Sequence, residues 1–231
     1  HLKKIKNFVK LYTQKPNNTF NLISIIHTFE HVTDHFSFFN FIKSISNKNS
    51  KIFIQIPNFK NSTYDILIAD HVTHFDKRTI LSTLKKFLNI EYYSEEIDKE
   101  ISIVGTIKNN FENKKKIISN YYIKSKLKLN ERIQYFFNLK KLLSNTKNKI
   151  YVYGTTIASS WITGNFRSKI KGYIEDDLRK INKTFYGKKI INLKNLNEEK
   201  DHILLPFNTE VIKKILLKNK KSKYKFLYLN D

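Results

Sequence analysis

The sequence FNLISIIHTFEHV, residues 20–32, sets the pattern for the first half of the chain. It opens with an apolar run of strand length and continues into a polar cluster that holds His27, Glu30 and His31. A short apolar run bounded by polar residues predicts a buried strand over residues 20–26. Asp34 then stands at the N-cap position of a predicted helix that runs to about Ser46.

The alternation of strand and helix continues to residue 107. KIFIQIP, residues 51–57, predicts a second strand, and Asp76 caps a predicted helix with apolar residues at Ile80 and Leu84. Two further β-prone stretches lie near residues 90–93 and 101–107. This order predicts a mostly parallel sheet with helices on its faces and a final antiparallel pair of strands.

Residues 110–148 contain no glycine or proline and are rich in lysine. We expect them to form a solvated helical linker, with one break near Leu129 and Asn130. Beyond the linker, the stretches 150–153, 170–174 and 202–205 read as strands, the block 186–196 as a short strand with its connection, and residues 158–162 and 209–218 as helices. The predicted organisation is a first α/β domain over residues 1–109, a linker over 110–148 and a small second α/β domain over 149–231.

Composition narrows the class of protein. The 231 residues include no cysteine, which excludes disulfides, thiolate zinc sites and a cysteine nucleophile, and we predict no metal site. No apolar run approaches the roughly eighteen residues needed to span a bilayer, and no signal peptide opens the chain. A cytoplasmic location is therefore expected. Because residue 1 is His1 rather than methionine, we also expect an N-terminal part to be missing.

The formal net charge of +23 raises the possibility of nucleic-acid binding. The lysine excess is its only support, because lysine also fills solvent-facing positions in a chain this rich in Asn, Ile and Phe. Arginines, which make bidentate contacts to bases and phosphates, are few. The sequence does not favour nucleic acid as a partner, and it leaves homo-oligomerisation open.

Three motifs together resemble class I S-adenosylmethionine-dependent methyltransferases. Residues 20–32 resemble the fourth-strand motif of that family, and KIFIQIPNF, residues 51–59, resembles the fifth-strand motif. ADHVTHFDKRTI, residues 69–80, resembles the segment that follows the fifth strand in many sugar and small-molecule methyltransferases. IYVYGTTIASSWI with IKGYIEDD resembles the C-terminal Rossmann-like domain of sugar C-methyltransferases. The resemblance implies an α/β fold, with a partial Rossmann-like methyltransferase sheet and a second, smaller Rossmann-like α/β domain.

The resemblance also implies roles for particular residues of the first domain. His27 would lie near the cofactor, S-adenosylmethionine, and His71 would act as general base with Asp70 as its neighbour. The acceptor would be a small polar molecule, such as a nucleotide-linked sugar or a surface-polysaccharide precursor. The residues expected to face it are Glu30, His31, Asn58 and His74.

In the second domain, Gly154, Thr155 and Asp176 are candidate ligand contacts, although a single glycine at a strand-to-helix turn also fits plain packing. Structural explanations exist for the first motifs too: an acid at a helix N-terminus, and a capping loop with solvated histidines.

The chain departs from the family in one large respect. The glycine-rich loop after the family's first strand, and the acid that ends its second strand, are nowhere in the 231 residues. The N-terminal zinc-binding domain of sugar C-methyltransferases has no counterpart in the 231 residues either, because they include no cysteine. Two rival functions therefore stay open: a non-catalytic remnant that serves ligand binding or assembly, and a basic nucleic-acid-binding protein.

Overall fold

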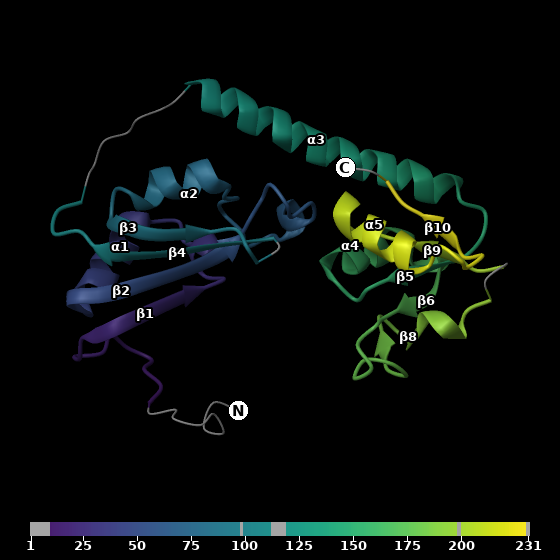
Figure 1. Ribbon diagram of the computed structural model, residues 1–231, viewed down its shortest axis with the longest axis horizontal. Helices are drawn as coiled ribbons and strands as arrows, with labels where there is room; N and C mark the ends of the chain where they lie inside the picture. Colours follow the sequence, from purple (N-terminus) through teal and green to yellow (C-terminus); the bar gives the residue numbers. More distant parts are fainter. Residues whose placement is uncertain (1–9, 98, 112–118, 198–199, 230–231) are drawn as a thin grey trace. The chain divides into compact units, whose positions relative to one another are not determined.

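A computed structural model describes residues 10–97, 99–111, 119–197 and 200–229 of the chain (Figure 1). The chain divides into a first unit of residues 1–58 and 71–114 and a second unit of residues 59–70 and 115–231. Each unit contains its own sheet, of four and six strands respectively, together with helices. The expectation of an α/β fold is therefore confirmed at the level of fold class.

The first unit builds a four-stranded sheet in the order β1-β2-β4-β3 (Figure 1). Its elements in chain order are β1 (Phe20–Ile26), a 3-10 turn η2 (Phe29–His31), α1 (His35–Ser44), β2 (Ser46–Pro57), α2 (Lys77–Leu84), β3 (Leu88–Ser94) and β4 (Glu100–Ile107). β1 pairs with β2 in parallel, whereas β4 runs antiparallel to both β2 and β3. The expected antiparallel pair of β3 and β4 is present. The expectation of a mostly parallel sheet is wrong, because β4 inserts between β2 and β3 and leaves β1 and β2 as the parallel pair.

Local chemistry explains where the two helices of this unit begin. The Asp34 side chain accepts a hydrogen bond from the Ser37 backbone N–H, and Asp76 forms a capping box with Thr79. Both helices then bury an apolar face against β2. The shared core contains Phe39 and Ile42 of α1, Ile80 and Leu84 of α2, and Ile52, Ile54 and Ile56 of β2.

The second unit builds a six-stranded sheet in the order β10-β9-β5-β6-β8-β7. Its elements in chain order are β5 (Ile150–Tyr153), α4 (Ile157–Phe166), β6 (Ile170–Ile174), β7 (Thr184–Phe185), β8 (Lys188–Ile191), β9 (His202–Leu204), α5 (Thr209–Lys218) and β10 (Lys225–Leu227). All neighbouring strands are parallel except β7 and β8. The chain lays β6 and β8 on one side of β5 and β9 and β10 on the other, so the strand order reverses between β5 and β9.

The predicted linker differs from the structure in two ways. α3 (Ser119–Asn145) is one helix that continues through Leu129 and Asn130, where a break was expected. Neither residue is glycine or proline, so neither imposes a large penalty inside a helix. α3 is also not a solvated linker, because one of its faces enters the core of the second unit. The buried residues on that face are Tyr135, Phe136, Leu139 and Leu143. Residues 112–118 of the predicted linker lie outside the described residues.

A short segment inserted in the first unit's sequence also belongs to the second unit. Residues 59–70 pack against α3: the buried Arg132 guanidinium donates to Thr63 Oγ1 at 2.9 Å and to the Lys60 carbonyl at 2.7 Å. The units therefore do not follow the predicted boundaries at residues 109 and 149. No helix in the described part of the chain is long and apolar enough to cross a membrane.

Candidate active site in the first unit

The candidate site begins where β1 ends. His27 follows the strand with φ of 46°, in the left-handed region that residues other than glycine rarely adopt. Its backbone N–H donates to the Gln55 carbonyl of β2 at 2.9 Å, which holds it at the carboxyl edge of the sheet. Such backbone conformations cost of the order of 1–3 kcal/mol and cluster at functional sites.

Phe29 anchors the turn that follows. Its side chain is fully buried and stacks on Phe75 with ring centroids 5.4 Å apart. The backbone of Thr73 donates to the Glu30 carbonyl at 3.2 Å. Packing and hydrogen bonding thus hold the loop before α2 against the turn after β1, which brings together two motifs that are forty residues apart in the sequence.

Glu30 is the centre of the resulting cluster. Its side chain is only 2% exposed, and Oε1 lies 3.4 Å from His27 Nδ1 and 3.9 Å from His71 Nε2. Both distances exceed that of an ordinary N–H···O hydrogen bond. Neither Glu30 carboxylate oxygen has a hydrogen-bond partner among the described residues. A buried carboxylate without hydrogen bonds is energetically costly, and this makes the position unusual.

Three more side chains complete the surroundings. His27 Nε2 lies 3.4 Å from Glu100 Oε1, so the half-exposed imidazole stands between two carboxylates. The rings of His31 and His71 meet edge to face with centroids 4.8 Å apart. His74 lies farther out, with its ring centroid 6.3 Å from that of His71. The structure therefore gathers His27, Glu30, His31 and His71 at one edge of the first sheet, with His74 beside them.

Two predicted site residues take other positions. Asn58 is buried after β2, and its amide nitrogen donates to Glu95 Oε2 at 2.8 Å in the segment that follows β3. This bond gives the amide a structural role, because it ties β2 to the loop between β3 and β4. Asp70 is exposed and falls in the segment 59–70 of the second unit, so we do not include it in the cluster beside His71.

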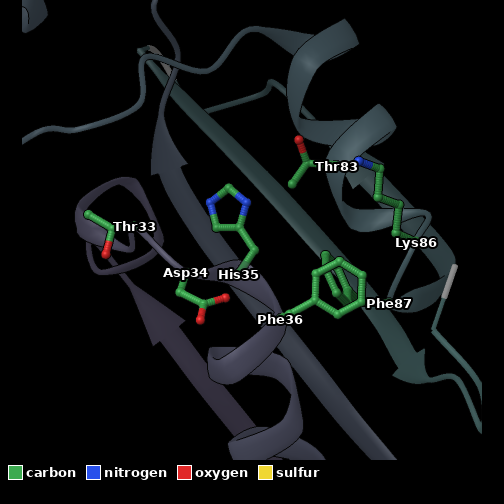
Figure 2. A pocket seen from close by; sticks show the side chains of 7 residues that line it. All are labelled: Thr33, Asp34, His35, Phe36, Thr83, Lys86 and Phe87. Carbon is green, nitrogen blue, oxygen red and sulfur yellow. The ribbon is translucent and has the colours of Figure 1, made fainter. Parts of the chain in front are cut away.

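A separate pocket of about 320 Å³ lies at the start of α1 (Figure 2). It is lined by Thr33, Asp34, His35 and Phe36, together with Thr83, Lys86 and Phe87 from α2 and the turn after it. Burial lowers the pKa of His35, and the nearby positive charge of Lys86 lowers it further. None of the residues predicted for the site lines this pocket.

The turn after β5 in the second unit is closed by its own side chains. Gly154 has φ of +85°, as glycine allows, and a Cβ there would meet Phe207 at 3.2 Å. The Thr155 backbone N–H donates to Glu175 Oε1 at 2.8 Å, and Lys180 Nζ donates to the same oxygen at 2.9 Å. Burial alone would raise the pKa of Glu175, but these hydrogen bonds lower it below its ordinary value.

Asp176 is also engaged within the second unit. Both of its carboxylate oxygens accept from the Tyr153 hydroxyl at 3.0 Å. Burial and the Asp176 charge raise the pKa of that phenol. Gly154, Thr155 and Asp176 therefore all serve internal contacts, and the Thr155 N–H could reach a ligand only if Glu175 moved.

Sequence reasoning missed Glu100 and Glu175. Glu100 opens β4 directly opposite Pro57, so only the antiparallel register brings its carboxylate to the edge where β1 and β2 end. Glu175 directly follows β6, and the sequence motif at the end of that strand pointed to its neighbour Asp176 instead.

Compared with known proteins, the chain matches no protein-family model and no curated protein sequence.

Proposed function

We propose that the first unit carries the acceptor side of a S-adenosylmethionine-dependent methyltransferase acting on a small polar acceptor, such as a nucleotide-linked sugar or a surface-polysaccharide precursor. One observation carries the proposal. Three motif residues from two segments of the chain, His27 and Glu30 from one and His71 from the other, converge at the carboxyl edge of β1 and β2. Ligands of open α/β sheets bind at this edge.

The charges of the site fit the reactive end of the donor. The carboxylates of Glu30 and Glu100 flank His27, and a sulfonium cation is stabilised by nearby negative charge. When bound, the donor supplies an electrophilic methyl carbon and departs as a neutral thioether. The glycine-rich loop that binds the rest of the donor in the family has no counterpart in the 231 residues. The fit therefore concerns the methyl end alone.

The residues of the cluster would orient the donor, bind the acceptor and remove its proton. His27 would orient the donor, while Glu30, His31 and His74 would bind the polar groups of the acceptor. His71 Nε2 would take the proton that the acceptor oxygen or carbon loses, and Glu30 Oε1, 3.9 Å away, would stabilise the imidazolium so formed. Holding the acceptor in line with the methyl carbon would supply most of the rate enhancement.

The second unit supports the proposal through its topology. A parallel sheet whose strand order reverses between β5 and β9 is the arrangement of doubly wound folds, which bind ligands at that point. We assign this unit a supporting role, in assembly or in holding part of the acceptor. The internal contacts of Thr155 and Glu175 argue against a phosphate at the turn itself.

Calorimetric titration of S-adenosylmethionine into the full-length protein, including any residues encoded before His1, tests the proposal. We expect saturable binding of one donor per chain and methyl transfer to at least one nucleotide-linked sugar in a panel. Glu91→Gln, which removes an exposed carboxylate that pairs with Lys51, is the control that should leave both unchanged. Absence of binding at about 1 mM, the upper end of usual substrate constants, would overturn the proposal. Binding without transfer would favour the non-catalytic remnant.

A further inference from the structure

The cluster around Glu30 contains three side chains with the spacing of a metal site. One ligand atom each of Glu30, His31 and His71 can be chosen so that all three lie within 4.8 Å of one another. Zinc binds histidine nitrogen and carboxylate oxygen at about 2.0–2.2 Å in a tetrahedral arrangement, so two of its ligands are about 3.4 Å apart. The 3.9 Å between His71 Nε2 and Glu30 Oε1 exceeds that separation by about half an ångström. Small side-chain rotations would close the remaining gap.

The burial of Glu30 supplies an independent reason for a cation at this position. Its carboxylate is almost completely withdrawn from water, and among the described residues neither oxygen accepts a hydrogen bond. Buried charges in proteins are paired or coordinate metals, since an ionised carboxylate that is neither costs several kcal/mol. A divalent ion between the three groups would supply a positive charge directly against the carboxylate.

We propose that Glu30, His31 and His71 bind a divalent transition-metal ion of the zinc or manganese class. Two imidazoles and one carboxylate are a donor set for such ions, and they leave coordination positions open for a further ligand. The absence of cysteine excludes only thiolate sites. The sequence-based prediction of no metal site rested on that absence, and the two histidines and the glutamate were read as acceptor contacts and base.

The open positions define what the ion would bind. An oxygen donor is favoured, because a hydroxyl bound to such an ion loses its proton far more readily than a free hydroxyl. In the class of acceptors this selects hydroxyl-bearing molecules, a selection that rests on the proposed function. With the ion bound, His71 is one of its ligands, so the ion and not the His71 imidazole would promote the loss of the hydroxyl proton. The ion site itself does not rest on it, because an ion can bind whether or not a methyl group is transferred.

Titration of ZnCl2 alone into EDTA-treated, dialysed full-chain protein tests the inference, with no methyl donor or acceptor present. We expect one ion per chain, with a dissociation constant of about 10 µM or lower, and a higher melting temperature with the ion bound. Glu30→Gln, His31→Gln and His71→Gln should each weaken binding by about a hundredfold or more. Loss of a residue that only supports a metal ligand already costs 10–100-fold.

Two matched control variants distinguish zinc binding at this site from nonspecific zinc binding. Glu91→Gln removes an exposed carboxylate of the same unit, and His202→Gln removes an imidazole of β9 in the second unit. Both should leave the dissociation constant within about twofold of the wild-type value. Circular dichroism must show that each variant is folded. Because His31 and His71 are substituted separately, the inference can still be tested if one of the two variants does not fold. Equal zinc binding by the folded Glu30→Gln, His31→Gln and His71→Gln variants, or no binding by the wild type at about 100 µM, would overturn the inference.

Discussion

At the scale of single residues, Glu30 combines deep burial with a lack of hydrogen bonds. Groups of this kind lower the stability of the fold, and they persist where they serve binding or catalysis. His27 beside it adds a second unfavourable feature, its left-handed backbone. Two energetically unfavourable features three positions apart in the sequence single out this edge of the sheet as a candidate site more clearly than either residue would alone.

Glu30→Gln should therefore stabilise the metal-free protein. The amide has the shape of the carboxylate and carries no charge, so the substitution removes the desolvation cost of an uncompensated ion. We expect the free energy of unfolding at pH 7 in EDTA to rise by about 1–2 kcal/mol, measured by urea denaturation. Glu91→Gln is the control and should change it by less than about 0.5 kcal/mol. A clear loss of stability in Glu30→Gln would show that the carboxylate is well compensated in the fold.

His71→Gln tests the proposed proton transfer. If His71 removes the acceptor proton, turnover in the full-length enzyme should fall by about a hundredfold or more, the usual contribution of a positioned base. Donor affinity should change little, because His27, the residue assigned to the donor, is unaltered. Glu91→Gln serves as the control, since its exposed carboxylate pairs with Lys51 away from the cluster. Full activity of His71→Gln would place the base elsewhere.

At the scale of elements, α3 shows how a helix read as a linker becomes part of a core. Lys126, Asn130, Asn138, Lys140 and Lys141 are exposed, while Tyr135, Phe136, Leu139 and Leu143 recur at helical spacing on the buried face. The Phe136 ring packs on Trp161 of α4 with centroids 5.0 Å apart. The helix therefore contributes to the stability of the second unit directly.

Leu143→Ala should destabilise the second unit by about 2–5 kcal/mol, because the side chain is fully buried and its removal leaves a cavity. Phe137→Ala is the matched control on the same helix: its ring is 62% exposed, and the change should cost less than about 0.5 kcal/mol. Urea denaturation followed by Trp161 fluorescence measures both. Equal effects of the two substitutions would contradict the docking of α3 in the core.

The contact between the end of β6 and the turn that leads from β5 into α4 depends on an ionised Glu175. Its pKa lies below the ordinary value of 4.5, because hydrogen bonds from Thr155 and Lys180 outweigh the effect of burial. A lowered carboxyl pKa contributes stability above the unfolded-state value and loses it as the pH falls through the folded-state value. Glu175→Gln should thus have a lower free energy of unfolding than the wild type at pH 7. This difference between the two proteins should become smaller below pH 4.5. Urea midpoints across this range measure the difference, and a constant difference would exclude a contribution from the charge.

At the scale of the whole molecule, the two units have separate cores that are joined by more than one crossing of the chain. The chain leaves the first unit after Asn58, returns at His71 and leaves it again after residue 114. Arg132 and Thr63 show why the inserted segment belongs to the second unit: the Thr63 hydroxyl accepts a hydrogen bond from a buried guanidinium.

The two cores should respond separately to mutation. Trp161, the single tryptophan of the chain, packs against the second core and reports its unfolding, while circular dichroism reports both units. Phe39→Ala, at a fully buried site of the first core, should shift part of the dichroism transition to lower urea and leave the fluorescence midpoint unchanged. A shift of the fluorescence midpoint by the same amount would mean that the two cores unfold as one.

Local patterns in the sequence were enough to predict much of the fold. The apolar runs of β1 and β5 and the caps at Asp34 and Asp76 were predicted correctly, because hydrophobic periodicity and side-chain capping act over a few residues. The same local signals located the histidines and glutamate after β1 and β2. Whether those residues bind a methyl donor, an acceptor or a metal stays a prediction.

Only the tertiary structure decided which distant groups meet. The insertion of β4 beside β2 brings Glu100 to His27, and the packing of Phe29 on Phe75 brings His71 to Glu30. Long-range contacts also place α3 and residues 59–70 in the second unit. A contact of the same kind pairs the Asn58 amide with Glu95. Such contacts depend on strand order and on the burial of whole faces, which no short window of sequence contains.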